Sequence, residues 1–134
     1  MKTRISEHFF REEFACKGEH CCGHSAPVDS CLIEALEELR FLINKNLEED
    51  LPLVIVSGFR CNIHNADVHG AEDSQHTKAR AADIKPPHGI TPGQLAAYAE
   101  EVHLFKYGGI GIYDGWVHVD VRGTKARWDE RSEK

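Results

Sequence analysis

An Asp-Gly pair between two runs of alternating residues constrains the fold of this chain more than any other feature. The pair, Asp114-Gly115, separates the runs Gly109–Tyr113 and Trp116–Arg122. Asp-Gly is favoured in two-residue type I′ turns because both central residues need positive φ angles. The pattern therefore predicts a β-hairpin with a type I′ turn near the carboxyl end.

The register of this hairpin brings polar side chains together on one face. A two-residue turn pairs Gly111 with His118 and Gly109 with Asp120. Because side chains alternate along a strand, His118 and Asp120 share their face with Arg122. Glycine has no side chain, so we expect room over both polar residues for a metal and a ligand. The alternative is that the glycines relieve crowding against a helix.

Further patterns predict the elements that precede the hairpin. An apolar stripe at helical spacing runs from Val28 to Ile43 and follows Pro27, which predicts a helix. Short apolar runs predict strands, and a capping box with proline at the first helical position predicts another helix. These are strands at Leu53–Val56 and Ala81–Ile84, a short helix at Asn62–Val68, and a helix that begins at Thr91-Pro92-Gly93-Gln94.

The predicted fold class is α+β: a small single domain with an antiparallel sheet, whose terminal β-hairpin packs against helices. A chain of 134 residues favours a single compact core. We place this domain at residues 1–124. Residues 125–134 are rich in charge, and we expect a frayed carboxyl-terminal tail there, apart from Trp128.

Charge and hydropathy exclude some classes of partner. Sixteen Lys and Arg against 22 Asp and Glu leave a formal net charge of −6, so we expect no nucleic acid as partner. No apolar run approaches the roughly 20 residues of a membrane span, and we expect no membrane partner. The amino end lacks an apolar signal segment, so we expect synthesis in the cytoplasm and release by other machinery. We expect a monomer.

Three short segments contain candidate ligands for a metal ion. They are Ser74-Gln75-His76, Ala81-Ala82-Asp83 and Val117-His118-Val119-Asp120. Two imidazoles and one carboxylate fill three positions of a tetrahedral zinc site and leave the fourth for a water molecule. The alternative is that these are ordinary surface or capping residues, because scattered histidines and aspartates usually are.

Several motifs, taken in this order, resemble the zinc D-alanyl-D-alanine carboxypeptidase family over roughly Phe9 to Trp128. They are Glu13-Phe14-Ala15-Cys16, Ser57-Gly58-Phe59-Arg60-Cys61, Ser74-Gln75-His76, Arg80-Ala81-Ala82-Asp83-Ile84, Gly109-Ile110-Gly111-Ile112-Tyr113 and Trp116-Val117-His118-Val119-Asp120-Val121-Arg122-Gly123. The family comprises peptidoglycan peptidases that share their fold with D-Ala-D-Ala dipeptidases and the Hedgehog signalling domain.

The resemblance implies a function and roles for particular residues. It implies Zn²⁺ held by His76, Asp83 and His118, with Arg60 near the scissile carbonyl and Ser74 near the substrate carboxylate. An arginine fork suits a developing oxyanion, and a hydroxyl can donate to a carboxylate. We therefore expect a zinc peptidase domain of D-Ala-D-Ala carboxypeptidase type, acting on peptidoglycan stem peptides in the cell wall or periplasm. The alternatives are an endopeptidase of phage-lysin type and a non-catalytic, zinc-stabilised binding module.

The chain departs from the family pattern at two positions. Ala79 stands where the family usually has glycine, three residues after the first histidine ligand. Gly115 stands where several relatives have an acidic base. We expect Asp120 to be the general base, because it lies about 7 Å along the strand from His118, with Asp114 as the alternative base. Asp120 could instead orient a ligand or pair with Arg122.

The five cysteines leave their chemical state open, because an odd number cannot all form disulfides within the chain. Cys16, His20, Cys21, Cys22 and His24 could bind a second, structural metal, although their spacing fits no standard zinc finger. The alternative is ordinary thiols in a loop, with Cys61 either meeting Cys16 or remaining free. Residues 65–73 precede the first histidine ligand and could line a substrate groove.

Overall fold

The computed structural model describes residues 2–19, 21–71 and 74–132. The described residues form a mostly antiparallel sheet of strand order β1-β2-β4-β3-β5. The strands are β1 (Val54–Ser57), β2 (Ala81–Lys85), β3 (Gly109–Ile112), β4 (Val117–Asp120) and β5 (Ala126–Asp129). The helices are α1 (Ser30–Leu47), α2 (Asn62–Asp67), α3 (Pro92–Ala99) and α4 (His103–Lys106), with 3-10 turns η1 (Arg11–Phe14) and η2 (Gln75–Lys78). The predicted α+β class is confirmed.

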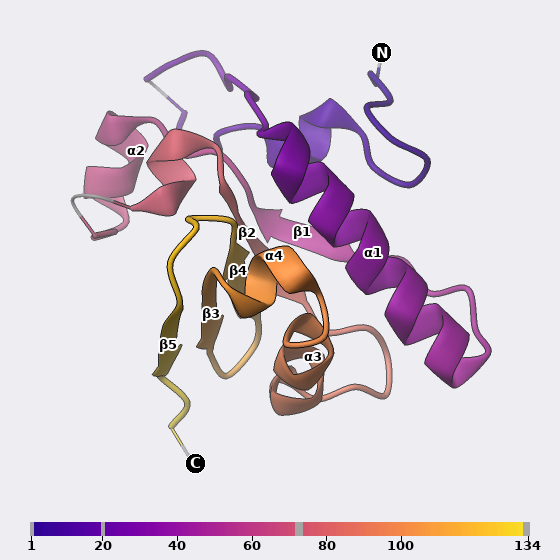
Figure 1. The fold of residues 1–134 in the computed structure, drawn as a ribbon. Helices are drawn as coiled ribbons and strands as arrows, with labels where there is room; N and C mark the ends of the chain where they lie inside the picture. Colours follow the sequence, from indigo (N-terminus) through magenta and orange to yellow (C-terminus); the bar gives the residue numbers. More distant parts are fainter. Residues whose placement is uncertain (1, 20, 72–73, 133–134) are drawn as a thin grey trace.

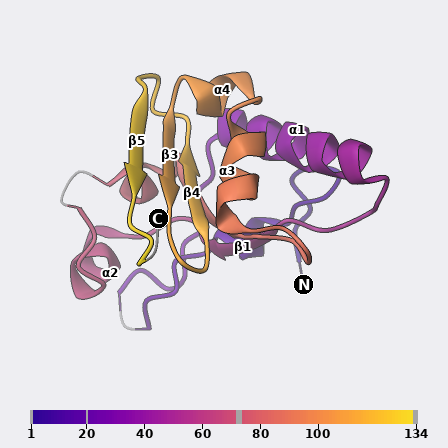
Figure 2. The same ribbon diagram turned by 90° about the horizontal axis from the view of Figure 1, so that it is seen from below.

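The sheet has two faces with different environments. Helices α1, α3 and α4 cover one face, where the apolar side chains of the strands and helices form the core (Figure 1, Figure 2). Helix α2 and turn η2 lie at the far side from α1 (Figure 1). Alternation along β4 sends Val117 and Val119 into the core and His118 and Asp120 to the opposite face. No described helix is both long enough and apolar enough to span a bilayer.

The predicted hairpin is present with the predicted register, but its turn is different. Gly111 pairs with His118, and the Tyr113 N–H donates to the Trp116 carbonyl at 3.0 Å. Neither Asp114 nor Gly115 has a positive φ, so the predicted type I′ turn is wrong. The Asp114 carboxylate accepts from the backbone N–H and the hydroxyl of Ser132. The turn is thus held by a segment that is distant in sequence.

The predicted frayed tail is wrong for Ala126–Asp129, which form strand β5 beside β3 in parallel pairing. The strand is anchored by Arg127, whose guanidinium donates to the Glu100 carboxylate and to the carbonyls of Lys106 and Gly108. The charges of the tail therefore serve as anchors and do not indicate disorder. The last two residues of the predicted tail, 133 and 134, lie outside the described residues.

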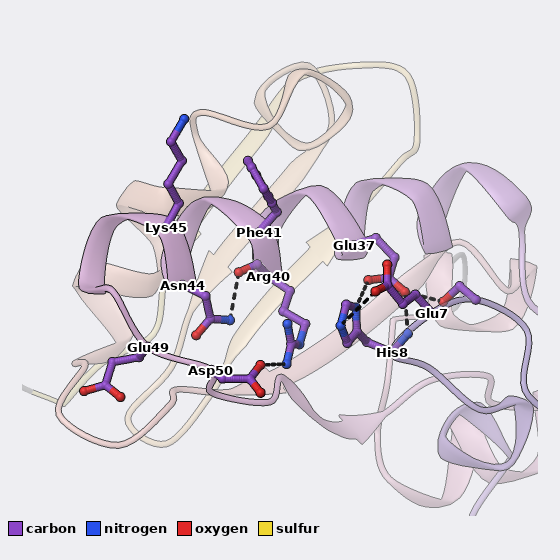
Figure 3. Close-up of a pocket in the computed structure, with 10 residues that line it drawn as sticks. Glu7, His8, Glu37, Arg40, Phe41, Asn44, Lys45, Glu49 and Asp50 are labelled. Carbon is purple, nitrogen blue, oxygen red and sulfur yellow. Dashed lines mark hydrogen bonds and ion pairs between the residues drawn. The ribbon is translucent and has the colours of Figure 1, made fainter.

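The amino-terminal segment is attached to helix α1 through the carboxylate of Glu37 (Figure 3). This carboxylate accepts from the Ser6 hydroxyl at 2.6 Å and from the His8 backbone N–H at 2.7 Å, and it contacts the His8 ring nitrogen Nδ1 at 2.6 Å. The attachment places Phe9 and Phe14, both 1% exposed, in the core. Burial raises the pKa of Glu37, but the bonds from Ser6 and His8 outweigh it and hold that pKa below its usual range.

We expect this carboxylate to make stability depend on pH. Because the pKa of Glu37 is lowered by folding, its contribution is present above the ordinary carboxyl pKa of about 4.3 and is lost as the pH falls through the lowered value. Glu37→Gln should reduce the free energy of unfolding by about 2 kcal/mol at pH 7, with the deficit shrinking in acid. Urea unfolding from pH 7 to pH 3 measures this, with the exposed neighbour variant Glu38→Gln as control. An equal deficit for Glu37→Gln at every pH would contradict the ionic role.

Candidate metal centre

Three side chains from separate elements bring their donor atoms together on the polar face of the sheet. His76 comes from η2, while Asp83 on β2 and His118 on β4 are directly opposite in the strand register. His76 Nε2 lies 3.2 Å from His118 Nδ1 and 3.3 Å from Asp83 Oδ1, and His118 Nδ1 lies 3.4 Å from Asp83 Oδ1. A tetrahedral zinc site with bonds of about 2.05 Å has ligand separations of about 3.3 Å. The three atoms therefore suit one face of a zinc tetrahedron.

The outer nitrogens of both imidazoles are held so that the inner nitrogens keep their lone pairs. His76 Nδ1 lies 2.7 Å from the Gly58 carbonyl oxygen, and His118 Nε2 lies 2.6 Å from Asp120 Oδ2. A carbonyl and a carboxylate only accept, so each outer nitrogen donates its hydrogen. In the neutral form of each imidazole the inner nitrogen then carries a lone pair, and both inner nitrogens face one point with Asp83. Such outer partners orient the histidines of metal sites.

Asp120 lies on the far side of His118 from the donor atoms. Its side chain is fully buried and accepts from His118, from the Gly109 N–H at 2.9 Å and from the backbone N–H and guanidinium of Arg122. Burial raises its pKa, but the bonds from His118 and Arg122 outweigh it and hold that pKa well below its usual range. The geometry gives Asp120 the alternative role raised from the sequence, which is to orient His118 and pair with Arg122, and it does not favour the role of base.

The gaps left by the two glycines are filled by protein atoms. A Cβ on Gly109 would lie 2.2 Å from an Asp120 carboxylate oxygen, and one on Gly111 would lie 2.2 Å from the Trp128 ring. The prediction that these glycines leave room for a metal and a ligand is therefore wrong. The glycines instead admit the carboxylate and the indole that surround His118, whose ring centroid lies 4.9 Å from that of Trp128.

Electrostatic interactions support the ionised state of Asp83. Burial raises the pKa of its carboxyl, but the bonds with His118 and His76 outweigh this and hold the pKa well below its usual range. Burial lowers the pKa of His118, but its contacts with Asp120 and Asp83 raise that pKa by more, so the net shift is upward. A negative carboxylate beside two imidazoles is a donor set that suits a divalent cation of the zinc type.

Arg60 reaches the same centre from the turn that follows β1. Its guanidinium lies 3.9 Å from Asp83 Oδ2 and donates to Asn65 Oδ1 at 3.1 Å. The turn is fixed because the Arg60 N–H donates to the His76 carbonyl, and because a Cβ on Gly58 would lie 2.6 Å from Phe14 Cα. Burial lowers the pKa of Arg60, although Asp83 opposes that effect. The arginine stays a cation, as its high ordinary pKa requires.

Ser74 and Ala79 flank the first histidine ligand at the two ends of η2. The Ser74 hydroxyl oxygen accepts from the His76 N–H at 3.2 Å and caps the turn. Ala79 has φ 59° and ψ 26°, in the left-handed region. The family's glycine would be unstrained there, whereas a residue with Cβ costs about 1 kcal/mol or more. The chain keeps the left-handed backbone and tolerates the methyl group.

A cleft of about 530 Å³ opens over the donor atoms. Its wall includes Arg60, Ser74 and the metal-site residues His76, Asp83 and His118, together with Val68, His69, Gly70, Ala71, Gln75, Tyr113, Trp116, Arg122, Trp128 and Glu130. The stretch predicted to line a groove thus contributes residues 68–71, whereas residues 72 and 73 lie outside the described residues. Neither Asp114 nor Asp120 is among the lining residues.

Glu130 and Tyr113 also line this cleft, and neither was predicted from the sequence. The ring of Tyr113 stacks on that of Trp116 with centroids 4.7 Å apart, and its hydroxyl accepts from Trp128 Nε1 at 2.8 Å. Glu130 follows β5, two residues after Trp128, and its side chain is exposed. The alternation Trp128-x-Glu130, in the segment predicted to be a tail, was the signal that could have placed the side chains of Trp128 and Glu130 on this face.

Comparison with known proteins identifies the family to which these features correspond. A family model described as peptidase M15 matches residues 7–120, which is most of the chain. The match includes both histidines and the aspartate of the metal centre. No curated protein matches the chain.

We predict that removing one imidazole abolishes metal retention. His118→Ala leaves two of the three protein donors, so the zinc held at this centre should be lost on dialysis, while His88→Ala, at an exposed site away from the centre, should keep it. The measurement is zinc per chain by elemental mass spectrometry, compared between His118→Ala, His88→Ala and the unmodified chain after the same dialysis. Undiminished retention of that zinc by His118→Ala would contradict the assignment.

Proposed function

The chain belongs to the peptidase M15 family of metallopeptidases, and from this premise we propose that it is a zinc-dependent D-Ala-D-Ala carboxypeptidase acting on peptidoglycan stem peptides in the cell wall or periplasm. The observation that carries the proposal is the triangle of donor atoms on His76, Asp83 and His118, with sides of 3.2 to 3.4 Å beneath an open cleft. Fixed imidazole tautomers support a resident metal at this point.

The roles of the surrounding residues follow from their chemistry. When bound, zinc supplies Lewis acidity and lowers the pKa of a water molecule from about 15.7 toward 7. Arg60 offers a planar fork of donors to the oxygen of the scissile carbonyl as negative charge develops there. Ser74 caps η2 with its oxygen, so its hydroxyl hydrogen can donate to the terminal carboxylate of the substrate. Both side chains line the same cleft as the donor triangle.

A proton acceptor is also needed, and we propose Glu130 for it. Among the described residues that line the cleft, Glu130 is the one carboxylate other than Asp83. The two acids expected from the sequence are otherwise engaged, Asp120 with His118 and Arg122, and Asp114 with Ser132. A carboxylate in this position can take a proton from water and return it to the leaving amine.

The same donor triangle would serve an endopeptidase that cuts within the stem peptide or its cross-link. The stacked rings of Tyr113 and Trp116 favour this second candidate, because they extend the cleft wall beyond the donor atoms and could hold further residues of a longer peptide. A non-catalytic binding module is less well supported, because the cationic Arg60 lies beside the metal donors where a binding module has no need of it.

The decisive experiment identifies the fragments released from purified peptidoglycan by the zinc-loaded protein. Free D-alanine and a stem peptide shortened by one residue are expected. Arg60→Ala should keep its zinc, because guanidinium cannot ligate a cation, and lose turnover by about 100-fold or more. Arg60→Lys, which keeps charge without the fork, should restore little. Release of longer peptides alone would favour the endopeptidase, and absence of any cleavage by zinc-loaded protein would contradict the proposal.

Three carboxylate variants distinguish the candidate proton acceptors. Glu130→Gln should retain zinc and lose turnover by about 100-fold. Asp114→Asn should affect stability more than turnover. Asp120→Asn should weaken zinc binding about 10- to 100-fold and recover turnover when zinc is in excess. A zinc-loaded Asp120→Asn that stays inactive beside a fully active Glu130→Gln would reverse this choice.

A further inference from the structure

Four of the five cysteines gather at one point, apart from the histidine and aspartate centre. The sulfur atoms of Cys16, Cys21, Cys22 and Cys61 all lie within 4.8 Å of one another, and all are free thiols. The fifth, Cys31, is exposed on helix α1. Three of the four belong to the amino-terminal loop and one to the turn after β1, so the cluster exists only in the folded chain.

The spacing of the sulfurs fits metal coordination better than disulfide bonding. Cys16 Sγ lies 4.0 Å from Cys21 Sγ and 3.8 Å from Cys61 Sγ, and Cys21 Sγ lies 3.9 Å from Cys22 Sγ. A tetrahedral zinc ion with Zn–S bonds of about 2.3 Å has sulfurs about 3.8 Å apart. Disulfide sulfurs lie at about 2.05 Å. These three separations match the edges of a zinc–thiolate tetrahedron, and the remaining pairs lie within 4.8 Å.

The backbone of the loop is shaped to close over the sulfurs. A Cβ on Gly18 would lie 2.5 Å from Cys21 Sγ and 3.0 Å from His64 Cβ, so only glycine permits this approach. Gly23 and His24 both have positive φ and turn the chain back, after which the Cys16 N–H donates to the Ser25 carbonyl at 2.8 Å. The described residues of this loop, 16–19 and 21–25, therefore turn back around the cluster.

The fourth sulfur comes from the other side of the cluster. Cys61 precedes helix α2, and its Sγ accepts from the His64 N–H at 3.4 Å. A backbone N–H directed at sulfur stabilises a thiolate. Cys16 is fully buried, and the other three sulfurs belong to half-buried residues.

We propose that Cys16, Cys21, Cys22 and Cys61 bind a second zinc ion, as a structural site with four thiolate ligands. Such a donor set selects soft cations, of which zinc is the common structural choice, and closed sites of this kind stabilise a fold. The ligands differ from those considered from the sequence. His24 is not one of them, since its Nδ1 lies 2.8 Å from the Cys16 carbonyl oxygen, and His20 lies outside the described residues.

The site has a consequence for the peptidase centre. Cys61 directly follows Arg60, whose backbone N–H already bonds to the carbonyl of His76. A zinc ion on Cys61 would tie the Arg60 turn to the amino-terminal loop and thereby hold the guanidinium over Asp83. Cys61 is in this sense a positioning residue for Arg60, and the inference about the thiolate site itself does not depend on the proposed reaction.

Zinc counting on variants of the full chain tests the site, with protein purified under reducing conditions without chelator. The unmodified chain and Cys31→Ser should each hold two zinc ions, and His118→Ala and Cys61→Ser should each hold one. With cobalt in place of zinc, His118→Ala should keep the near-ultraviolet sulfur-to-cobalt charge-transfer band, and Cys61→Ser should lose it. Retention of the band by Cys61→Ser at full intensity would overturn the assignment.

Thiol protection provides a second measurement that needs no cysteine variant to fold. In the zinc-loaded native His118→Ala protein, an alkylating reagent should modify Cys31 rapidly and the other four cysteines only after a chelator is added. Mass spectrometry of the peptides locates the modified residues. Rapid modification of all five, or a native mass lowered by two hydrogens for a disulfide among the four, would overturn the proposal.

Discussion

A buried carboxylate organises the polar face of this molecule. Asp120 receives hydrogen bonds from the His118 ring, the Gly109 backbone and the Arg122 guanidinium, and none of its surface is exposed. A buried charge of this kind is tolerated only when it is fully bonded. The need to satisfy Asp120 therefore fixes the rotamer of His118, and with it the direction of the lone pair offered to a metal. The position of glycine at residue 109 follows from the same need.

The other half of the centre comes from segments outside the regular sheet. His76 lies on a 3-10 turn, where the Gly58 carbonyl oxygen accepts from its ring, and Arg60 comes from the same turn after β1 as Gly58. These segments are short and would not hold their positions alone. Packing of Phe14 against Gly58 and the gathering of four sulfurs around Cys61 attach them to the amino-terminal segment. The candidate metal centre thus depends on the amino-terminal segment as well as on the sheet.

Local patterns predicted much of the architecture. The apolar stripe of α1, the capping box of α3 and the register of the terminal hairpin each depend on neighbours within one or two turns or strands, and each is present. The resemblance to the M15 peptidases is confirmed by the family match over residues 7–120. The three predicted metal ligands are brought together by the fold, and their roles stay a prediction.

The sequence by itself determined which residues share a strand face and which family the chain belongs to, because alternation and motif order are properties of neighbouring residues. Only the tertiary structure decided what occupies the space above that face. The Asp120 carboxylate and the Trp128 ring fill the gaps at Gly109 and Gly111. A charged tail became strand β5, and Cys61 joined three sulfurs some 40 positions earlier in the chain. These outcomes depend on contacts between segments far apart in sequence, whose side chains compete for the same space, and no local pattern records that competition.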